Sequence, residues 1–183
     1  TYNFMPVFDW TRTQLDKTDA DGSTSLVMYW EQMKGLDPLK DDIHLPGWDS
    51  SYTQSEVREL IGAYGKIGAE GRWANLEKFL KKVIPVAEEC GVRMAIHPDD
   101  PPHPIFGLPR ILSNAGDIAE MYKKCPSKHV GLTLCTGSLG GDRANDAVEI
   151  MKKFGRRVYF CHFRNLEYTD DKVFHESQCH LVG

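Results

Sequence analysis

The stretch Gly91-Val-Arg-Met-Ala-Ile-His97-Pro-Asp-Asp-Pro-Pro102 decides the fold of this chain. Its first part, Val92–Ile96, is typical of a short buried strand, which stops at His97 before a loop rich in proline and aspartate. Two later apolar stretches repeat the arrangement, one ending in Cys135 and the other in His162. The separations, 135 − 97 = 38 and 162 − 135 = 27 residues, each leave room for a helix and two loops. Parallel α/β folds place their chemistry at the carboxyl ends of strands, so we expect these three side chains to share one rim.

The segments before and between these strands predict helices. Residues 72–90 carry apolar side chains at three- and four-residue steps, and a weaker helix, interrupted by glycines, precedes them from Ser55. Residues 114–124 predict another helix, and a further one is expected to begin at Asp142 as its cap and to end at Gly155. The order β-α-β-α-β with apolar strands indicates the α/β class, a parallel sheet covered on both faces. The pattern alone does not separate an open sheet from a closed (β/α)8 barrel.

Residues 13–52 form a long polar connection broken by glycine and proline, which is typical of a lid or of a disordered insertion. Within it we expect a helix only around Ser25–Met33. In its second half, Trp48 is a candidate to reach over a pocket, and the alternative is a tryptophan packed in a surface turn. Later in the chain, Val173–Glu176 is expected to begin another strand or a segment of the rim. We treat residues 1–183 as a single domain.

Composition narrows the functional classes. The chain has 183 residues, 41% of them hydrophobic, and a net charge of −4, so it can bury a core and lacks the basic surface of a nucleic-acid-binding protein. No apolar run reaches the roughly eighteen residues of a membrane span, and the first residues lack a signal-peptide pattern. Five dispersed cysteines without a CxxC pair are typical of reduced thiols. We therefore expect a cytoplasmic protein with neither a nucleic-acid nor a membrane partner.

Two imidazoles and a thiolate at neighbouring strand ends suit a divalent ion, although a single strand-end histidine is more often structural. Ligand softness alone makes zinc the first choice. Arg164, two residues after His162, is placed either to bind a substrate carboxylate or to form a salt bridge at the rim. Asp99 either orients the His97 ring or is a solvated loop residue. The further candidates around the rim are Asn3, Arg12, Arg110 and His175.

Four motifs follow one another along the chain: Tyr2-Asn-Phe-Met-Pro-Val-Phe-Asp-Trp-Thr-Arg12, Ala95-Ile-His-Pro-Asp-Asp-Pro-Pro102, Leu134-Cys-Thr-Gly-Ser138 and Cys161-His-Phe-Arg-Asn165. Together they resemble the mannonate dehydratase family. The resemblance implies a (β/α)8 TIM barrel of the xylose-isomerase-like type, of which this chain would form the central part. It also implies a hydro-lyase that converts D-mannonate to 2-keto-3-deoxy-D-gluconate and water in glucuronate catabolism.

The resemblance assigns residues as well. It implies Mn²⁺ or Fe²⁺ in place of zinc, held by His97, Cys135 and His162, because a sugar acid supplies oxygen ligands. We expect Arg164 and His175 to be catalytic. The expected substrate-binding residues are Asn3, Arg12, Trp48, Asp99 and Arg110. Two alternatives stay open, a metal-dependent sugar isomerase or epimerase on the same barrel and an inactive metal-binding fragment, and so does a homo-oligomeric state.

Overall fold

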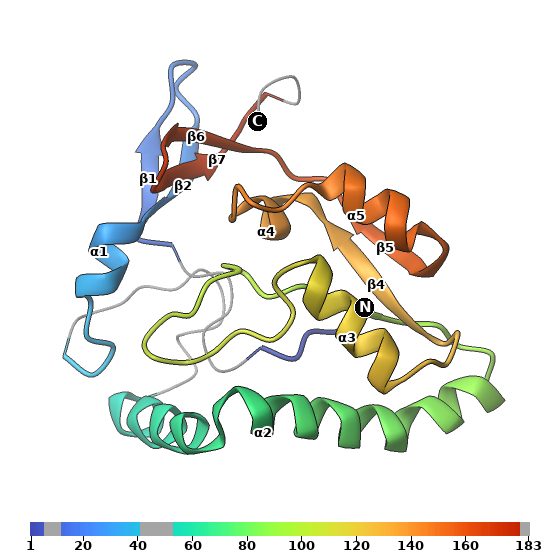
Figure 1. Ribbon diagram of the computed structural model, residues 1–183. Helices are drawn as coiled ribbons and strands as arrows, with labels where there is room; N and C mark the ends of the chain where they lie inside the picture. The colour runs from blue at the N-terminus through green and yellow to red at the C-terminus, as the bar shows by residue number, and fades with distance from the viewer. Residues whose placement is uncertain (6–11, 41–52, 180–183) are drawn as a thin grey trace.

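The protein contains two small sheets, with helices packed around them. The computed structural model describes residues 1–5, 12–40 and 53–179. Among them, a three-stranded parallel sheet and a four-stranded antiparallel sheet lie at opposite sides of the molecule, and one long helix runs along the base (Figure 1). None of the described helices is long and apolar enough to cross a membrane.

The parallel sheet confirms the expected β-α-β-α-β order. It consists of β3 (Met94–Ile96), β4 (Val130–Cys135) and β5 (Val158–His162), in that spatial order. All six residues of β4 are buried, as expected for a strand with a neighbour on each side and cover on both faces. Tyr2 extends the same sheet, since its amide donates to the carbonyl of Ala95 at 2.9 Å in a parallel bridge to β3.

The helices around this sheet begin at residues that cap them. The side chain of Asn114 accepts from two backbone amides at the start of α3 (Ala115–Lys124). The cap of α5 (Ala147–Phe154) is Asp146, so the expectation that Asp142 begins this helix is wrong. The sequence reading also missed the short α4 (Thr136–Gly140), which follows directly on Cys135 and takes up part of the segment assigned to a loop. A 3₁₀ turn, Gly155–Arg157, leads from α5 into β5.

The helix at the base, α2 (Gln54–Glu89), spans both predicted helical segments. A capping box between Thr53 and Glu56 begins it. Of its glycines only Gly68 leaves the helical region, with φ 63° and ψ −175°, and this residue divides the helix into two parts. The second part buries its apolar stripe against α3 and the parallel sheet, forming the larger apolar core, which includes Leu76, Leu80, Ile84, Ile96, Ile118, Met121, Val130, Leu132 and Ile150.

The antiparallel sheet was not foreseen as a sheet. It joins β1 (Gln14–Thr18) and β2 (Thr24–Tyr29) to β7 (Val173–Glu176) and β6 (Leu166–Asp170), in the order β1-β2-β7-β6. The expected strand at 173–176 is β7, whereas β6 is not predicted from the sequence.

The helix expected around Ser25–Met33 is therefore wrong in its first half. Residues 24–29 form β2, and the helix α1 (Trp30–Gly35) begins only afterwards. The physical reason is a distant partner: Val27 and Met28 pair in register with His175 and Phe174 of β7, and such pairing overrides local propensity. The second half of the predicted lid, with Trp48, lies outside the described residues, and the role of residues 13–52 as a lid stays a prediction.

The fold class is thus mixed α/β. Within the part of the chain that the structure describes, the parallel strands form an open sheet, and the (β/α)8 barrel of which this chain would form the central part stays a prediction.

Candidate metal centre

Three side chains meet at the carboxyl ends of the parallel strands. Cys135 and His162 are partners in the register of β4 and β5, and His97 follows β3 directly. One ligand atom from each of the three residues lies within 4.8 Å of the other two, and the two imidazole centroids are 5.1 Å apart. Cys135 is fully buried and both histidines are half-buried. The structure therefore brings the three residues singled out in the sequence within reach of a common ion.

Hydrogen bonds between the turns that follow β4 and β5 keep these strand ends together. The hydroxyl of Thr136 donates to the carbonyl oxygen of Arg164 at 2.6 Å and accepts from its amide at 3.0 Å. Gly137 is needed at the same place, because a Cβ there would lie 2.7 Å from the Cβ of Arg164. The close approach of the two turns thus depends on a residue without a side chain.

The hydrogen bonding of His97 suits a metal ligand. Its Nδ1 lies 2.7 Å from the carbonyl oxygen of Pro98. Because a carbonyl only accepts, Nδ1 carries the proton and the lone pair of the neutral ring is on Nε2. A ligating histidine is commonly oriented by such a bond from its other nitrogen.

Two polar groups lie beside the sulfur of Cys135. The Ser138 hydroxyl, itself fully buried, is 3.1 Å from Sγ and donates its proton to Oδ2 of Asp100 at 2.8 Å, and Nη1 of Arg164 is 3.6 Å from the sulfur. Both groups come from the turns that follow β4 and β5. Two imidazoles with a buried sulfur form a donor set that divalent transition metals accept.

Behind the sulfur lies an ion cluster of four residues, Arg12, Asp100, Arg164 and Glu176. The two oxygens of Asp100 each accept from a different guanidinium, that of Arg12 at 2.9 Å and that of Arg164 at 2.9 Å. Glu176 also pairs with both arginines, at 3.0 Å from Arg12 and closer still to Arg164. Two positive and two negative charges thus balance in a largely buried site.

The cluster shifts the ionisation of its members. Burial alone would raise the pKa of Asp100, but the guanidinium groups of Arg12 and Arg164 outweigh it and hold that pKa well below its ordinary value. Burial alone would lower the pKa of Arg164, and here Asp100 and Glu176 outweigh it and raise that pKa. Asp100 and Arg164 are therefore both charged near neutral pH.

A cavity of about 710 Å³ opens beside the metal centre. Its walls include both imidazoles, His97 and His162, and the guanidinium of Arg164. Asn3, one of the expected substrate-binding residues, also lines it, and the half-exposed Phe160 and the largely exposed Phe163 add apolar surface. The cavity is large enough for a small-molecule substrate.

The other residues named from the sequence lie outside this cavity. The carboxylate of Asp99 accepts from the amides of Ile111 and Leu112 at 2.8 and 3.1 Å, and Arg110 donates to the carbonyl of His103 at 3.3 Å. His175 is buried, and strand alternation directs it to the face of β7 opposite Glu176. Trp48 lies outside the described residues, so the substrate-binding and catalytic roles of these residues stay predictions.

Sequence reasoning missed three members of this site. In the sequence, Asp100 stands out only as part of the motif after His97, Glu176 only as the end of the segment 173–176, and Ser138 only as part of the motif after Cys135. A usable signal existed for Glu176, because it follows the apolar residue Phe174 by two positions on one strand. No local signal links Arg12 to Asp100, since the bond joins residues far apart in the sequence.

The fold is α/β, and two imidazoles and a thiol meet at its strand ends beside an open cavity. These features are typical of metal-binding α/β proteins. Comparison with known families is more specific. Residues 1–183 match the D-mannonate dehydratase (UxuA) family, and the chain belongs to that family.

Individual relatives agree with this assignment. The chain is 48% identical to the mannonate dehydratase of Streptococcus uberis over 178 residues, covering 96% of this chain and 51% of the relative. It is 45% identical to mannonate dehydratase 2 of Halalkalibacterium halodurans, covering 96% of this chain and 52% of the relative. The crystal structure of mannonate dehydratase from Streptococcus suis serotype 2 superposes with a TM-score of 0.83 at 41% identity, covering 96% of this chain and 47% of that one. The chain thus spans about half the length of the relatives that it matches.

Proposed function

We propose that this chain carries the metal site of a hydro-lyase that dehydrates D-mannonate to 2-keto-3-deoxy-D-gluconate. The observation that supports the proposal is the convergence of His97, Cys135 and His162 in a member of the D-mannonate dehydratase family. These three residues would hold the ion, and Mn²⁺ or Fe²⁺ suits a substrate that offers carboxylate and hydroxyl oxygens.

The reaction is a β-elimination followed by tautomerisation. A base takes the proton at C2, the electron pair of the C2–H bond forms the C2–C3 double bond, and the C3 hydroxyl leaves as water after receiving a proton. The resulting enol then becomes the 2-keto acid. A divalent ion bound here supplies a Lewis acid for the negative charge that develops on the substrate oxygens.

The residues of the chain provide orientation and charge. We propose that Arg164 presents its guanidinium at the cavity wall to the substrate carboxylate, while its pairs with Asp100 and Glu176 keep it in one position. Asn3 contributes a polar side chain to the same cavity. His175 remains the candidate for proton transfer named from the sequence, although its side chain points away from the ion cluster.

A product assay tests this function. The Mn²⁺-loaded protein is incubated with D-mannonate, and we expect a 2-keto-3-deoxy acid together with an equal amount of lost substrate. A product that retains the water of the substrate would favour the sugar isomerase or epimerase. Bound metal without any product would favour a metal-binding fragment, and either result contradicts the proposal. The homo-oligomeric state and the cytoplasmic location stay predictions.

A further inference from the structure

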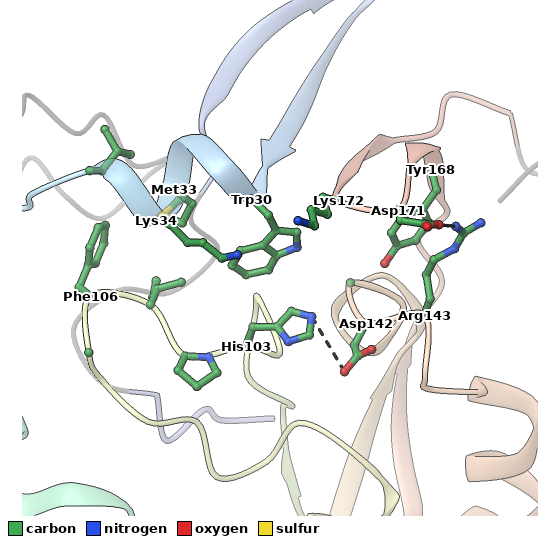
Figure 2. Close-up of a pocket in the computed structure, with 15 residues that line it drawn as sticks. Trp30, Met33, Lys34, His103, Phe106, Asp142, Arg143, Tyr168, Asp171 and Lys172 are labelled. Atoms are coloured by element: carbon green, nitrogen blue, oxygen red, sulfur yellow. Dashed lines mark hydrogen bonds and ion pairs between the residues drawn. The ribbon is translucent and has the colours of Figure 1, made fainter.

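A second pocket lies on the side of the antiparallel sheet, away from the metal centre. It has a volume of about 560 Å³, which is in the range of small-molecule sites. Its walls come from α1, from the loop 103–107, from residues 141–143 after α4 and from the β6–β7 hairpin (Figure 2). It shares no lining residue with the cavity at the metal centre.

Aromatic side chains form the middle of this pocket. The ring centroids of Trp30 and His103 are 4.8 Å apart, and the two ring planes are nearly perpendicular, at 86°. Tyr168 lies under the guanidinium of Arg143, 4.7 Å away, and its hydroxyl donates to the carbonyl of Gly140. The half-buried Trp30 therefore offers flat apolar surface to the pocket, which suits the C–H face of a ring.

The wall formed by the loop 103–107 contains a strained backbone conformation. Phe106 has a φ of 52°, a left-handed conformation that is uncommon for an aromatic residue, and Gly107 follows with a φ of 72°. The two residues form the tip of a tight turn that the amide of Leu108 closes onto the carbonyl of Ile105 at 2.8 Å. The turn places Phe106 in the lining of the pocket (Figure 2).

Charged groups of both signs surround the aromatic surface. Lys34 and Lys172, from two different elements, extend toward Trp30 (Figure 2), and both pair with the same oxygen of Glu31, at 3.2 and 2.8 Å. One carboxylate thus serves two ammonium groups, and pairs this exposed exchange partners readily. Across the pocket, Asp142 and Asp171 supply oxygens that accept hydrogen bonds (Figure 2).

We propose that this pocket binds a monosaccharide ring that carries a carboxylate, independently of the metal. The ring packs on Trp30, its hydroxyls donate to Asp142 and Asp171, and its carboxylate pairs with Lys34 and Lys172. A purely apolar ligand would make no use of the charged groups around the pocket, and a small inorganic anion would leave the aromatic surface uncovered. The proposal goes beyond the dehydratase function and does not rest on it.

Titration of the metal-free protein tests the site. Isothermal calorimetry in the presence of a chelator compares three probes: D-glucuronate, D-glucose and D-gluconate. These are a ring with a carboxylate, a ring without one and an open chain with one. We expect saturable binding of D-glucuronate, about tenfold tighter than that of either other probe, as one charge-assisted pair with the lysines would give.

Variants locate the binding. Replacing both lysines, Lys34→Ala with Lys172→Ala, should weaken D-glucuronate to the level of D-glucose, and Trp30→Leu should abolish binding of both rings. Lys152→Ala is the matched control, an exposed lysine in an ion pair with Glu149 outside the pocket, and it should change nothing. Trp30 packs against the smaller apolar core, so circular dichroism is used to check that the Trp30→Leu variant folds. If it does not fold, the double lysine variant still tests the site, because both lysines are exposed.

Three outcomes would overturn the proposal: no saturable binding of any probe, equal affinity for D-glucuronate and D-glucose, or binding that survives the lysine variants and disappears in Cys135→Ala. The last would move the ligand to the metal centre. Since the metal is removed, failure here leaves the dehydratase assay unaffected, and failure of that assay leaves this site unaffected.

Discussion

The parallel and the antiparallel sheet of this protein differ in the sequence separation of the strands that they pair. Each parallel strand follows its predecessor through a helical connection, α3 in the first case and α4 with α5 in the second, and the metal-centre residues lie at strand ends, at positions that the apolar pattern marks. The antiparallel sheet joins residues 14–29 to residues 166–176, so its pairing depends on contacts across nearly the whole chain. The ion cluster connects the two, because Asp100 and Arg164 follow parallel strands whereas Arg12 and Glu176 belong to the antiparallel side. The parallel sheet therefore positions the metal-centre residues, and the antiparallel sheet supplies two of the four residues of the ion cluster beside them.

Loss of the thiol gives the largest expected effect and is confined to the parallel side. Cys135→Ala removes one of the three proposed ligands, so we expect metal affinity to fall at least about a hundredfold, with loss of the proposed dehydratase activity. Equilibrium dialysis with Mn²⁺ measures this. The control is Cys125→Ala, which replaces a half-buried free cysteine that packs against the larger apolar core, and this variant should keep its metal. Unchanged metal content in Cys135→Ala would make the thiol a packing group.

The junction of the two sheets is broken by Asp100→Asn. The change leaves two guanidinium groups facing the single carboxylate of Glu176, so we expect the free energy of unfolding to fall by about 3 kcal/mol in urea titrations. Asp171→Asn is the control, because its pair with Arg143 is largely exposed, 86% at the aspartate, and is worth less than about 1 kcal/mol. Equal losses in the two variants would refute a structural role for the cluster.

The same carboxylate predicts a dependence on pH. Its pKa is lowered in the folded state, so its contribution is complete above the unfolded value of about 3.9 and is lost as the pH falls toward the folded value. Between about pH 5 and pH 3 the wild-type protein should lose more stability than Asp100→Asn. Parallel pH curves of the two proteins would contradict the assignment.

A methyl group at Gly137 tests how closely the turns must approach. Gly137→Ala places a Cβ 2.7 Å from the Cβ of Arg164, and we expect a loss of about 2 kcal/mol in unfolding free energy together with weaker metal binding. Gly140→Ala is the control in the same helix, since its added Cβ would meet only Leu166, at 3.9 Å. If Gly137→Ala behaved like Gly140→Ala, the turns would have more room than the structure gives them.

The smallest expected effect concerns the orientation of the sulfur. Ser138→Ala removes the hydroxyl that lies between Cys135 and Asp100, and we expect metal affinity to fall about tenfold in a protein that still folds, as for other residues that orient ligands. The thiolate-to-metal absorption band of the Co²⁺-loaded protein reports the sulfur directly and should shift. Ser138→Thr keeps a hydroxyl and should restore the band, whereas an unchanged band in Ser138→Ala would exclude this role.

The sequence predicted the parallel side because its signals are local. An apolar strand that stops at His97, Cys135 or His162 can be read without knowledge of its neighbours, and parallel pairing then aligns the strand ends. The antiparallel side offered no such pattern, since β2 was read as helix until its partner β7 was known. The ion cluster lay further out of reach, because Arg12 and Glu176 meet only after both sheets have formed. The predictions of Mn²⁺ or Fe²⁺ and of D-mannonate came from the family resemblance, because the residue types alone do not identify the metal or the substrate.

The most direct test of the metal centre is an anomalous-scattering map from crystals grown with Mn²⁺. The structure predicts one strong peak within bonding distance of Nε2 of His97, Sγ of Cys135 and a ring nitrogen of His162. A protein that binds Mn²⁺ in solution but shows its peak elsewhere, or shows none between these three side chains, would contradict the proposed site.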